Sequence, residues 1–477
     1  MTALAALYEP PCLIGGEEHR GAGQIDVTYP YKGELVGAAP LLRREQVRHA
    51  LDLAGAARVS LDRYERSVVL DRVAGAIEDA RDELAILITL ESGLCLSDTH
   101  HEVARAVDVF RFASREALRD DGQVWACDVS PNGRPRRAIT SREPLRLVAA
   151  VTPFNHPLNQ VAHKLAPAIA AGAPIVLKPS EKTPLAALWL ARAVLEAGYQ
   201  ADALAVVTGE REEVLDELLA HEAVELVMFT GGVEVGRLIA ARAGYRRTVL
   251  ELGGNDPLLV LADADLDEAA RLAVAGGTRN SGQRCTAVKR IVAEAPVAAE
   301  LTERIVAFAA ELTVGDPLDP LTDVGTLIDE EAAARVVARV ESAVDDGARL
   351  LHGGERVGAQ LVPPVLGDVR RESELVREET FGPALPVIAV AGLDEAIAVA
   401  NGTRYGLSAG VVSNDLAAVT RCIRELRCGT VNVREVPGFR TEETPFGGIK
   451  ASGLGAKEGV VESMRAMTNV KLATLPW

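Results

Sequence analysis

The chain has 477 residues, of which 48% are hydrophobic and 25% are charged, and its formal net charge is −17. This composition is typical of a soluble globular protein, and the length exceeds one ordinary hydrophobic core, so two or three domains are expected. The acidic balance disfavours nucleic acid and anionic membranes as partners, although a local cluster of arginines can still bind an anionic substrate.

The six cysteines are scattered, at positions 12, 95, 127, 285, 422 and 428, and none forms a Cys-x-x-Cys pair. No metal site is therefore expected. The first residues lack the basic start of a signal peptide, and no apolar run reaches the length of a bilayer span. We expect a cytoplasmic protein with free thiols.

The first 120 residues combine short strands and turns, up to about residue 45, with three helical patterns. These patterns cover residues 47–57, 63–88 and 101–118 and have charged outer faces. The next stretch, 121–143, carries the turn signals Asp121-Gly122 and Pro131-Asn132-Gly133 between short alternating segments, which predicts a β-hairpin.

From Arg146 onward the pattern alternates between strand and helix. Strands are expected over 147–151, 174–178, 204–207 and 226–229, and helices over 158–171, 185–197, 212–220 and 233–243. This alternation predicts a parallel sheet covered on both faces, with ligands at the carboxyl ends of the strands.

A second alternating unit runs from about residue 258 to 433 and predicts a separate α/β domain. It includes an amphipathic helix over 330–344 and a short apolar strand over 385–390. The stretch from Pro445 is expected to return toward the first domain.

Cys285 and Glu251 are the candidate catalytic residues. Cys285 lies in the loop Asn280-Ser281-Gly282-Gln283-Arg284-Cys285-Thr286 after a predicted helix, and Glu251 opens a Gly-Gly turn after an apolar strand. A thiolate and a positioned base together suit covalent acyl chemistry. The alternative for a single cysteine is a small buried apolar residue. The adjacent Arg284 is expected to favour the thiolate.

These two blocks resemble the aldehyde dehydrogenase superfamily, and the resemblance covers essentially the whole chain. The other matching motifs, in the family's order, are Thr152-Pro153-Phe154-Asn155, Lys178-Pro179-Ser180-Glu181, Phe229-Thr230-Gly231-Gly232, Glu378-Glu379-Thr380-Phe381-Gly382-Pro383 and Pro445-Phe446-Gly447-Gly448. The resemblance implies an α/β fold with a Rossmann-like NAD-binding domain (1–120 and 141–250) and an α/β catalytic domain (251–445). It also implies oligomerisation strands, within 121–140 and 460–477, in a homodimer or homotetramer.

The resemblance further implies a role for each catalytic residue. Cys285 attacks an aldehyde carbonyl, the side-chain amide of Asn155 and the backbone N–H of Cys285 hold the oxyanion, and Glu251 activates the water that hydrolyses the thioester. The implied cofactor is NAD. Its binding residues are Thr152, Pro153, Phe154, Lys178, Pro179, Ser180, Glu181, Thr230, Gly231, Gly232, Val235, Leu252, Gly253, Glu379 and Phe381.

Two details bear on the cofactor. Gly231 and Gly232 open a turn from strand to helix, where N–H groups favour phosphate, although Gly-Gly-x-x-x-Gly is not the usual dinucleotide fingerprint. The family often has serine at position 232, so Gly232 is a departure. The carboxylate of Glu181 should repel the 2′-phosphate of NADP, which favours NAD.

Four basic residues predict an anion-binding substrate pocket. Arg284 precedes the nucleophile and His156 follows Asn155, while the resemblance places Arg105 and Arg440 in the pocket walls. Each alone is more simply a surface or ion-paired side chain, but together they suit a phosphonate or phosphate.

This pattern is similar to phosphonoacetaldehyde dehydrogenases, which oxidise phosphonoacetaldehyde to phosphonoacetate with NAD. The alternative substrates are phosphonoformaldehyde, glyceraldehyde 3-phosphate and lactaldehyde, and the non-enzymatic alternative is an inactive NAD-binding protein of the same fold.

Overall fold

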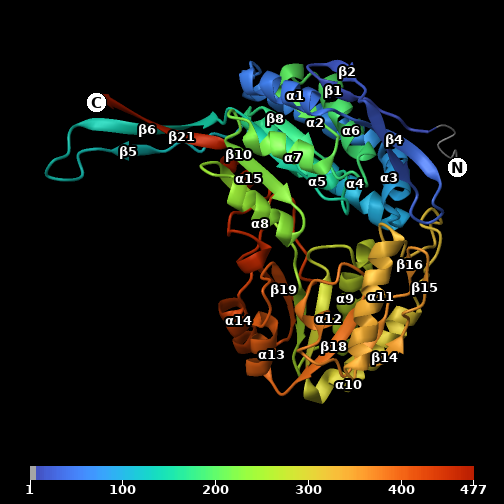
Figure 1. The fold of residues 1–477 in the computed structure, drawn as a ribbon. Coiled ribbons are helices and arrows are strands. Elements are labelled where there is room, and N and C mark those ends of the chain that lie inside the picture. Colours follow the sequence, from blue (N-terminus) through green and yellow to red (C-terminus); the bar gives the residue numbers. More distant parts are fainter. Residues whose placement is uncertain (1–6, 477) are drawn as a thin grey trace.

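Two largely parallel sheets, one from each half of the chain, organise the computed structural model, which describes residues 7–476 (Figure 1). The first sheet has five parallel strands in the order β11-β10-β7-β8-β9. Their bounds are β7 (Val148–Val151), β8 (Ile175–Lys178), β9 (Leu204–Val206), β10 (Leu226–Thr230) and β11 (Arg247–Glu251). The predicted strand–helix alternation is confirmed.

The second sheet has seven strands in the order β14-β17-β18-β13-β12-β19-β20, all parallel except β14 against β17. These are β12 (Asp256–Val260), β13 (Val288–Glu294), β14 (Arg349–His352), β17 (Val365–Gly367), β18 (Leu385–Val390), β19 (Ser408–Val412) and β20 (Thr430–Val433). Its helices are α9 (Leu266–Thr278), α10 (Ala295–Ala310), α11 (Glu330–Asp345), α12 (Glu374–Arg377), α13 (Leu393–Asn401) and α14 (Leu416–Glu425).

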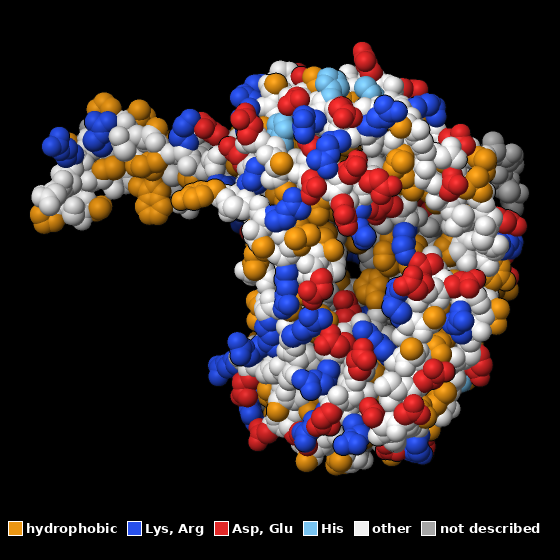
Figure 2. All heavy atoms as spheres, viewed as in Figure 1, with side chains coloured by type: hydrophobic (Ala, Val, Ile, Leu, Met, Phe, Trp, Pro, Cys, Tyr) orange, Lys and Arg blue, Asp and Glu red, His pale blue; other side chains and the backbone are white. Residues whose placement is uncertain are grey.

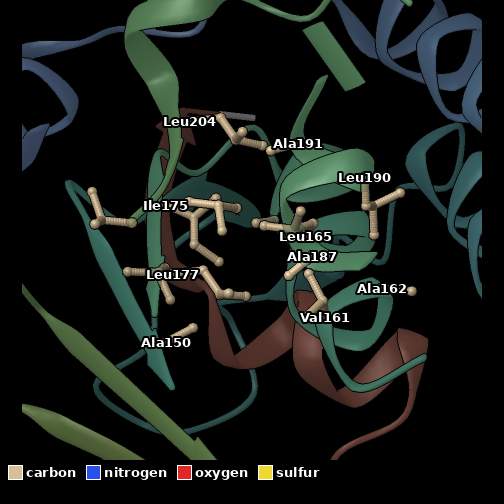
Figure 3. Packing of buried hydrophobic residues seen from close by; sticks show 14 of the residues in the cluster. Ala150, Val161, Ala162, Leu165, Ile175, Leu177, Ala187, Leu190, Ala191 and Leu204 are labelled. Atoms are coloured by element: carbon tan, nitrogen blue, oxygen red, sulfur yellow. The ribbon is translucent and has the colours of Figure 1, made fainter. Parts of the chain in front are cut away.

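The core of the first half forms because its strands are apolar on both faces, as expected for a covered parallel sheet. Figure 3 shows Ile175 and Leu177 of β8 facing Val161 and Leu165 of α5 (Asn159–Ala171). The remaining helices of this half are α1 (Arg44–Ala56), α2 (Arg63–Asp79), α3 (Arg81–Ser92), α4 (Leu96–Ala117), α6 (Leu185–Glu196), α7 (Arg211–Ala220) and α8 (Val233–Arg242). Short strands complete it: β1 (Cys12–Ile14), β2 (Glu17–His19), β3 (Gly23–Thr28) and β4 (Leu35–Leu41).

The single helix expected over 63–88 is wrong, because the chain forms two helices that meet at Ala80. Asp82 and Glu83 lie in the first turn of α3, where carboxylates stabilise a new helix N-terminus. The next helix, α4, begins at Leu96 instead of residue 101. Periodicity alone did not reveal these boundaries, since the apolar pattern continues across the junction at Ala80.

A three-stranded antiparallel arm projects from the body (Figure 1). The predicted hairpin is β5 (Val124–Ala126) and β6 (Arg136–Pro144), and β21 (Thr468–Pro476) pairs along the whole length of β6. The expectation that the chain returns toward the first half after Pro445 is confirmed, since α15 (Val460–Ala466) also packs on α5.

The carboxyl ends of the first sheet lead straight into the second sheet. β11 ends at Glu251, and after Gly253 and Gly254 the chain enters β12. The small hairpin β15 (Arg356–Val357) and β16 (Gln360–Leu361) lies beside the second sheet (Figure 1). Within residues 7–476 no helix combines the length and apolar character needed to cross a membrane.

Candidate active site

A cavity of about 440 Å³ lies where the ends of the two sheets meet, and Figure 2 shows the hollow between the two halves. Every predicted cofactor residue except Pro179 lines this cavity, together with Asn155, Glu251 and Cys285. The carbonyl oxygen of Pro179 instead accepts a hydrogen bond from Lys178 Nζ at 3.1 Å. Residues spread over more than 200 positions of sequence therefore share one cavity.

The loop that carries Cys285 is held in an unusual conformation. Asn280 and Ser281, in the 3₁₀ turn η2 (Arg279–Gly282), have φ values of +52°, and Gly282 has φ +69°. The Asn280 N–H donates to Asp98 Oδ2 at 2.7 Å. A Cβ atom at Gly282 would lie 2.2 Å from the carbonyl carbon of Gly382, so only glycine fits there. These contacts fix the position of the cysteine.

Asn155 lies against the same loop. Its Nδ2 donates to the carbonyl oxygen of Gln283 at 2.7 Å, which leaves its second N–H available. The backbone N–H of Cys285 makes no hydrogen bond to any residue that the structure describes. Two N–H donors are therefore available beside the thiol, the number that an oxyanion hole requires.

Burial dominates the protonation of Cys285. Burial, followed by the carboxylates of Asp256, Glu379 and Glu251, raises the pKa of the thiol to about 12. Arg284 acts in the opposite direction and lowers the pKa, but its effect is smaller. Arg284 therefore favours the thiolate, as expected, but loss of hydration and the neighbouring carboxylates outweigh this one cation.

Glu251 is also buried, and neither carboxylate oxygen has a hydrogen-bond partner among the described residues. Burial and the nearby carboxylate of Glu458 raise its pKa well above the usual value. Glu458 itself pairs with Lys164, whose Nζ also donates to Thr230 Oγ1 at 2.9 Å. Burial therefore favours the neutral form of both Glu251 and Cys285.

The far end of the cavity has the features of a nucleotide site. Gly232 caps α8, and a Cβ there would meet nothing within 4 Å, so a serine would also fit. Lys178 Nζ lies 2.9 Å from Glu181 Oε1. Nearer the thiol, Glu379 Oε1 accepts from the Gly254 N–H at 3.1 Å, and Phe381 packs edge-on against Phe154.

Sequence reasoning missed four cations that line the same cavity: Lys182, Arg211, Arg335 and Arg339. Lys182 pairs with Asp329, and Arg339 donates to the carbonyl oxygen of Glu379. Lys182 directly follows the motif Lys178-Pro179-Ser180-Glu181, a signal that could have found it, whereas no motif marks Arg211 of α7 or Arg335 and Arg339 of α11.

The predicted anion-binding residues gather around His156. Burial, then the charges of Arg105, Arg284 and Arg440, lower the pKa of His156 well below its usual value. Its Nε2 atom is 3.0 Å from Asn280 Nδ2 and accepts a hydrogen bond, so the imidazole is neutral and orients the cysteine loop. The role of His156 in binding the anion stays a prediction, and the three arginines all act on it electrostatically.

Sequence reasoning also missed Glu442, a buried carboxylate inside this arginine cluster. Its oxygens accept hydrogen bonds from Arg105 Nε at 2.5 Å and Nη2 at 3.2 Å. Arg284, by contrast, makes no hydrogen bond or ion pair within residues 7–476 and lies beside Gly438, where a Cβ would be 2.6 Å from Arg284 Nη2. Burial lowers the pKa of Arg284 to about 10, so it stays charged at neutral pH.

The raised pKa of Cys285 predicts how its alkylation depends on pH. A neutral reagent such as iodoacetamide reacts with the thiolate, whose fraction grows about tenfold per pH unit below the thiol pKa. We expect the rate at Cys285, followed by peptide mass spectrometry, to keep rising from about pH 7 to pH 10. The variant Cys285→Ser is the control for the assignment. A plateau near pH 8 would show that the thiol is not held neutral by burial.

Comparison with known proteins identifies the family of the chain. The profile of the aldehyde dehydrogenase family matches residues 17–473. The 3-sulfolactaldehyde dehydrogenase of Priestia megaterium is 35% identical and covers 100% of both chains. The lactaldehyde dehydrogenase of Methanocaldococcus jannaschii is 37% identical over 94% of this chain and 96% of that protein.

A solved structure gives the same result for the fold. Aldehyde dehydrogenase 21 from Physcomitrella patens, crystallised with its reaction product succinate, superposes with a TM-score of 0.95 at 33% identity and covers 99% of both chains. With the family profile matched over nearly its whole length and a cysteine, a glutamate and an asparagine meeting in one cleft, the chain belongs to the aldehyde dehydrogenase family of NAD(P)-dependent oxidoreductases.

Proposed function

We propose that the protein oxidises a small aldehyde bearing a strongly anionic group to the corresponding acid, with NAD as the preferred electron acceptor. The convergence of Arg105, Arg284 and Arg440 around His156 supports this substrate class. Arg105 and Arg440 share the carboxylate of Glu442, and Arg284 makes no ion pair among the described residues, which leaves an excess of positive charge next to Cys285. A bound anion would offset that excess.

The anion is proposed to be a phosphonate or a sulfonate. The phosphonoacetaldehyde that the sequence suggests stays a prediction, and a relative named for 3-sulfolactaldehyde favours a sulfonate on an aldehyde that is one carbon longer. Both groups are tetrahedral oxyanions that arginine N–H groups bind in the same way. Phosphonoformaldehyde and glyceraldehyde 3-phosphate would also offer an anion to the arginine cluster. Lactaldehyde is uncharged and would leave the positive charge of the arginines unmatched.

The site residues are proposed to act in sequence on the aldehyde. The sulfur of Cys285 bonds to the carbonyl carbon after its proton has left, and Asn155 with the Cys285 N–H donates to the oxyanion. NAD, held by the residues that line the cavity, would supply the hydride acceptor that this oxidation to a thioester requires. Glu251, once ionised, takes a proton from the water that attacks the thioester, and the acid leaves.

The cavity fits the proposed cofactor. The N–H groups at the start of α8 suit a pyrophosphate, and the open space at Gly232 leaves room for it. The carboxylate of Glu181 opposes a 2′-phosphate, which favours NAD. Arg211 and Lys182 line the same cavity and weaken that discrimination, so we propose that NAD is preferred and NADP is also used.

The arm is proposed to join two or more copies into a homodimer or homotetramer. Hydrophobic side chains on it are exposed in the single chain: Val124, Trp125, Ile139, Val470, Leu472 and Leu475. Figure 2 shows several orange groups along this projection. A contiguous apolar surface of this kind is typical of a protein interface.

Replacement of Arg284 tests the substrate class. We expect Arg284→Ala to reduce kcat/KM for phosphonoacetaldehyde or 3-sulfolactaldehyde by about 100-fold, because a desolvated guanidinium–anion contact is lost. The preference over acetaldehyde should shrink by a similar factor, measured by NADH absorbance. Arg304→Ala on α10, whose partners are surface carboxylates, is the control. If wild-type enzyme uses acetaldehyde equally well, the anionic substrate is wrong.

Replacement of Glu251 tests the hydrolysis step. Glu251→Gln cannot accept a proton from water, so we expect one rapid burst of about one NADH per site, followed by turnover slowed at least 100-fold. Stopped-flow absorbance measures both phases, and mass spectrometry should find an acyl adduct on Cys285. Absence of both the burst and the adduct would assign Glu251 to an earlier step.

Replacement of the exposed residues of the arm tests the assembly. Trp125→Ser combined with Leu472→Ser should shift the mass measured by light scattering toward the 50.5 kDa of one chain. Val357→Ser, at an exposed residue of the small hairpin β15–β16 beside the second sheet, should leave the mass unchanged. A wild-type protein that is already monomeric would contradict the proposed oligomer.

A further inference from the structure

Glu442 is a buried carboxylate to which the proposed reaction gives no task. It lies in the loop between β20 and α15, and its side chain is 5% exposed. Burying a charge in this way is costly unless the charge is fully paired. The hydrogen-bond and ion-pair partners of Glu442 therefore indicate its role.

The partners of Glu442 come from three separate segments. Arg105 of α4 binds it through two N–H groups, at 2.5 and 3.2 Å. His163 of α5 donates from Nε2 to Glu442 Oε2 at 2.5 Å, since a carboxylate can only accept. Arg440 Nη2 lies 4.0 Å from the same oxygen. Although burial alone would raise the pKa of Glu442, the hydrogen bond from His163 and the charges of Arg105 and Arg440 hold it well below its usual range.

These contacts determine which donors are left for a ligand. Arg105 uses Nε and Nη2 on Glu442 and keeps Nη1. Arg440 packs over the ring of Phe446, with its guanidinium carbon 4.2 Å from the ring centroid, and its buried Nη1 has no hydrogen-bond partner in the described part of the chain. Arg284 is unpaired in the same part. The cluster therefore has fixed guanidinium groups with unused N–H donors.

The like charges of Arg105 and Arg440 repel each other, and without a counter-ion the two side chains would separate toward solvent. Glu442 offsets this repulsion and fixes both groups by hydrogen bonding. We infer that Glu442 is a positioning residue: it holds Arg105 and Arg440 so that their remaining donors, together with Arg284, bind the anionic group of the substrate. This inference rests on the proposed function, that is, on an anion-bearing aldehyde.

The inference opposes the simplest electrostatic expectation. A negative charge inside an anion pocket should weaken anion binding, so a view based on charge alone predicts that Glu442→Gln lowers KM for an anionic aldehyde. If Glu442 instead preorganises the arginines, the same change raises KM, because the guanidinium groups must be ordered by the substrate itself. The two views predict opposite signs.

The test compares wild type, Glu442→Gln and Glu443→Gln. Glu443 is the adjacent, exposed glutamate, so its variant removes the same charge without touching the cluster. For Glu442→Gln we expect KM for phosphonoacetaldehyde to rise at least about tenfold, with a smaller change in kcat. Glu443→Gln should match wild type. An unchanged or lower KM in Glu442→Gln would overturn the inference.

A second readout does not depend on turnover. Iodoacetate is anionic and iodoacetamide is neutral, so the ratio of their alkylation rates at Cys285 reports anion binding beside the thiol. We expect Glu442→Gln to lower this ratio by a factor similar to the change in KM, and Glu443→Gln to preserve it. A ratio that rises in Glu442→Gln would support the charge-only view.

A further variant covers the possibility that Glu442→Gln does not fold, which circular dichroism and thermal melting will show. Arg105→Lys keeps the charge of the cluster but cannot hold Glu442 through two N–H groups. The inference predicts weaker binding of the anionic aldehyde in this variant, and a charge-only view predicts none. Unaltered KM and alkylation ratio in Arg105→Lys would overturn it.

The outcome also separates the two proposals. The proposed anionic substrate is wrong if the wild-type enzyme does not prefer phosphonoacetaldehyde or 3-sulfolactaldehyde over acetaldehyde and if iodoacetate and iodoacetamide alkylate Cys285 at equal rates. If wild type has the preference and Glu442→Gln keeps it, only the role of Glu442 fails.

Discussion

Loss of hydration governs the chemistry of the cleft in which the two sheets meet. Cys285 and Glu251 line this cleft and His156 contacts the cysteine loop through Asn280, and burial favours the neutral form of all three. A neutral thiol is a poor nucleophile, so burial restrains the reactivity of Cys285. A charged group that enters the cleft, such as the nicotinamide ring of NAD or an anion bound by the arginines, alters the protonation equilibria of Cys285, Glu251 and His156 together.

The fold assigns catalysis and substrate selection to different segments. The proposed catalytic residues lie at the end of β11 and in two loops, and the hydrogen bond from the Asn280 N–H to Asp98 holds the loop that contains Cys285. The arginines come instead from α4, from the residue before Cys285, and from the loop that contains Glu442. Substitutions in that loop can therefore change which aldehyde is bound without disturbing the strands that carry the chemistry.

The sequence predicted what depends on local pattern and on contiguous motifs. The strands of the first sheet and the contents of the cleft followed from alternation and from motifs at strand ends, which share one edge of a parallel sheet. Glu442 was not predictable, because Arg105 lies 337 positions and His163 lies 279 positions away along the chain. The net pKa of Cys285 was not predictable for a related reason: adjacency in sequence shows a neighbouring charge such as Arg284, but burial depends on the whole packed cleft.

The pairing of β21 with β6 has a consequence for how the chain is made. Thr468 pairs with Pro144 and Pro476 with Arg136, so β6 waits for a partner that the ribosome adds more than 300 residues later. Until then one edge of β6 is open and its apolar groups are uncovered, a state that invites pairing with another chain. The newly synthesised first half is thus the stage at which the protein is most exposed to misassembly and most dependent on chaperones.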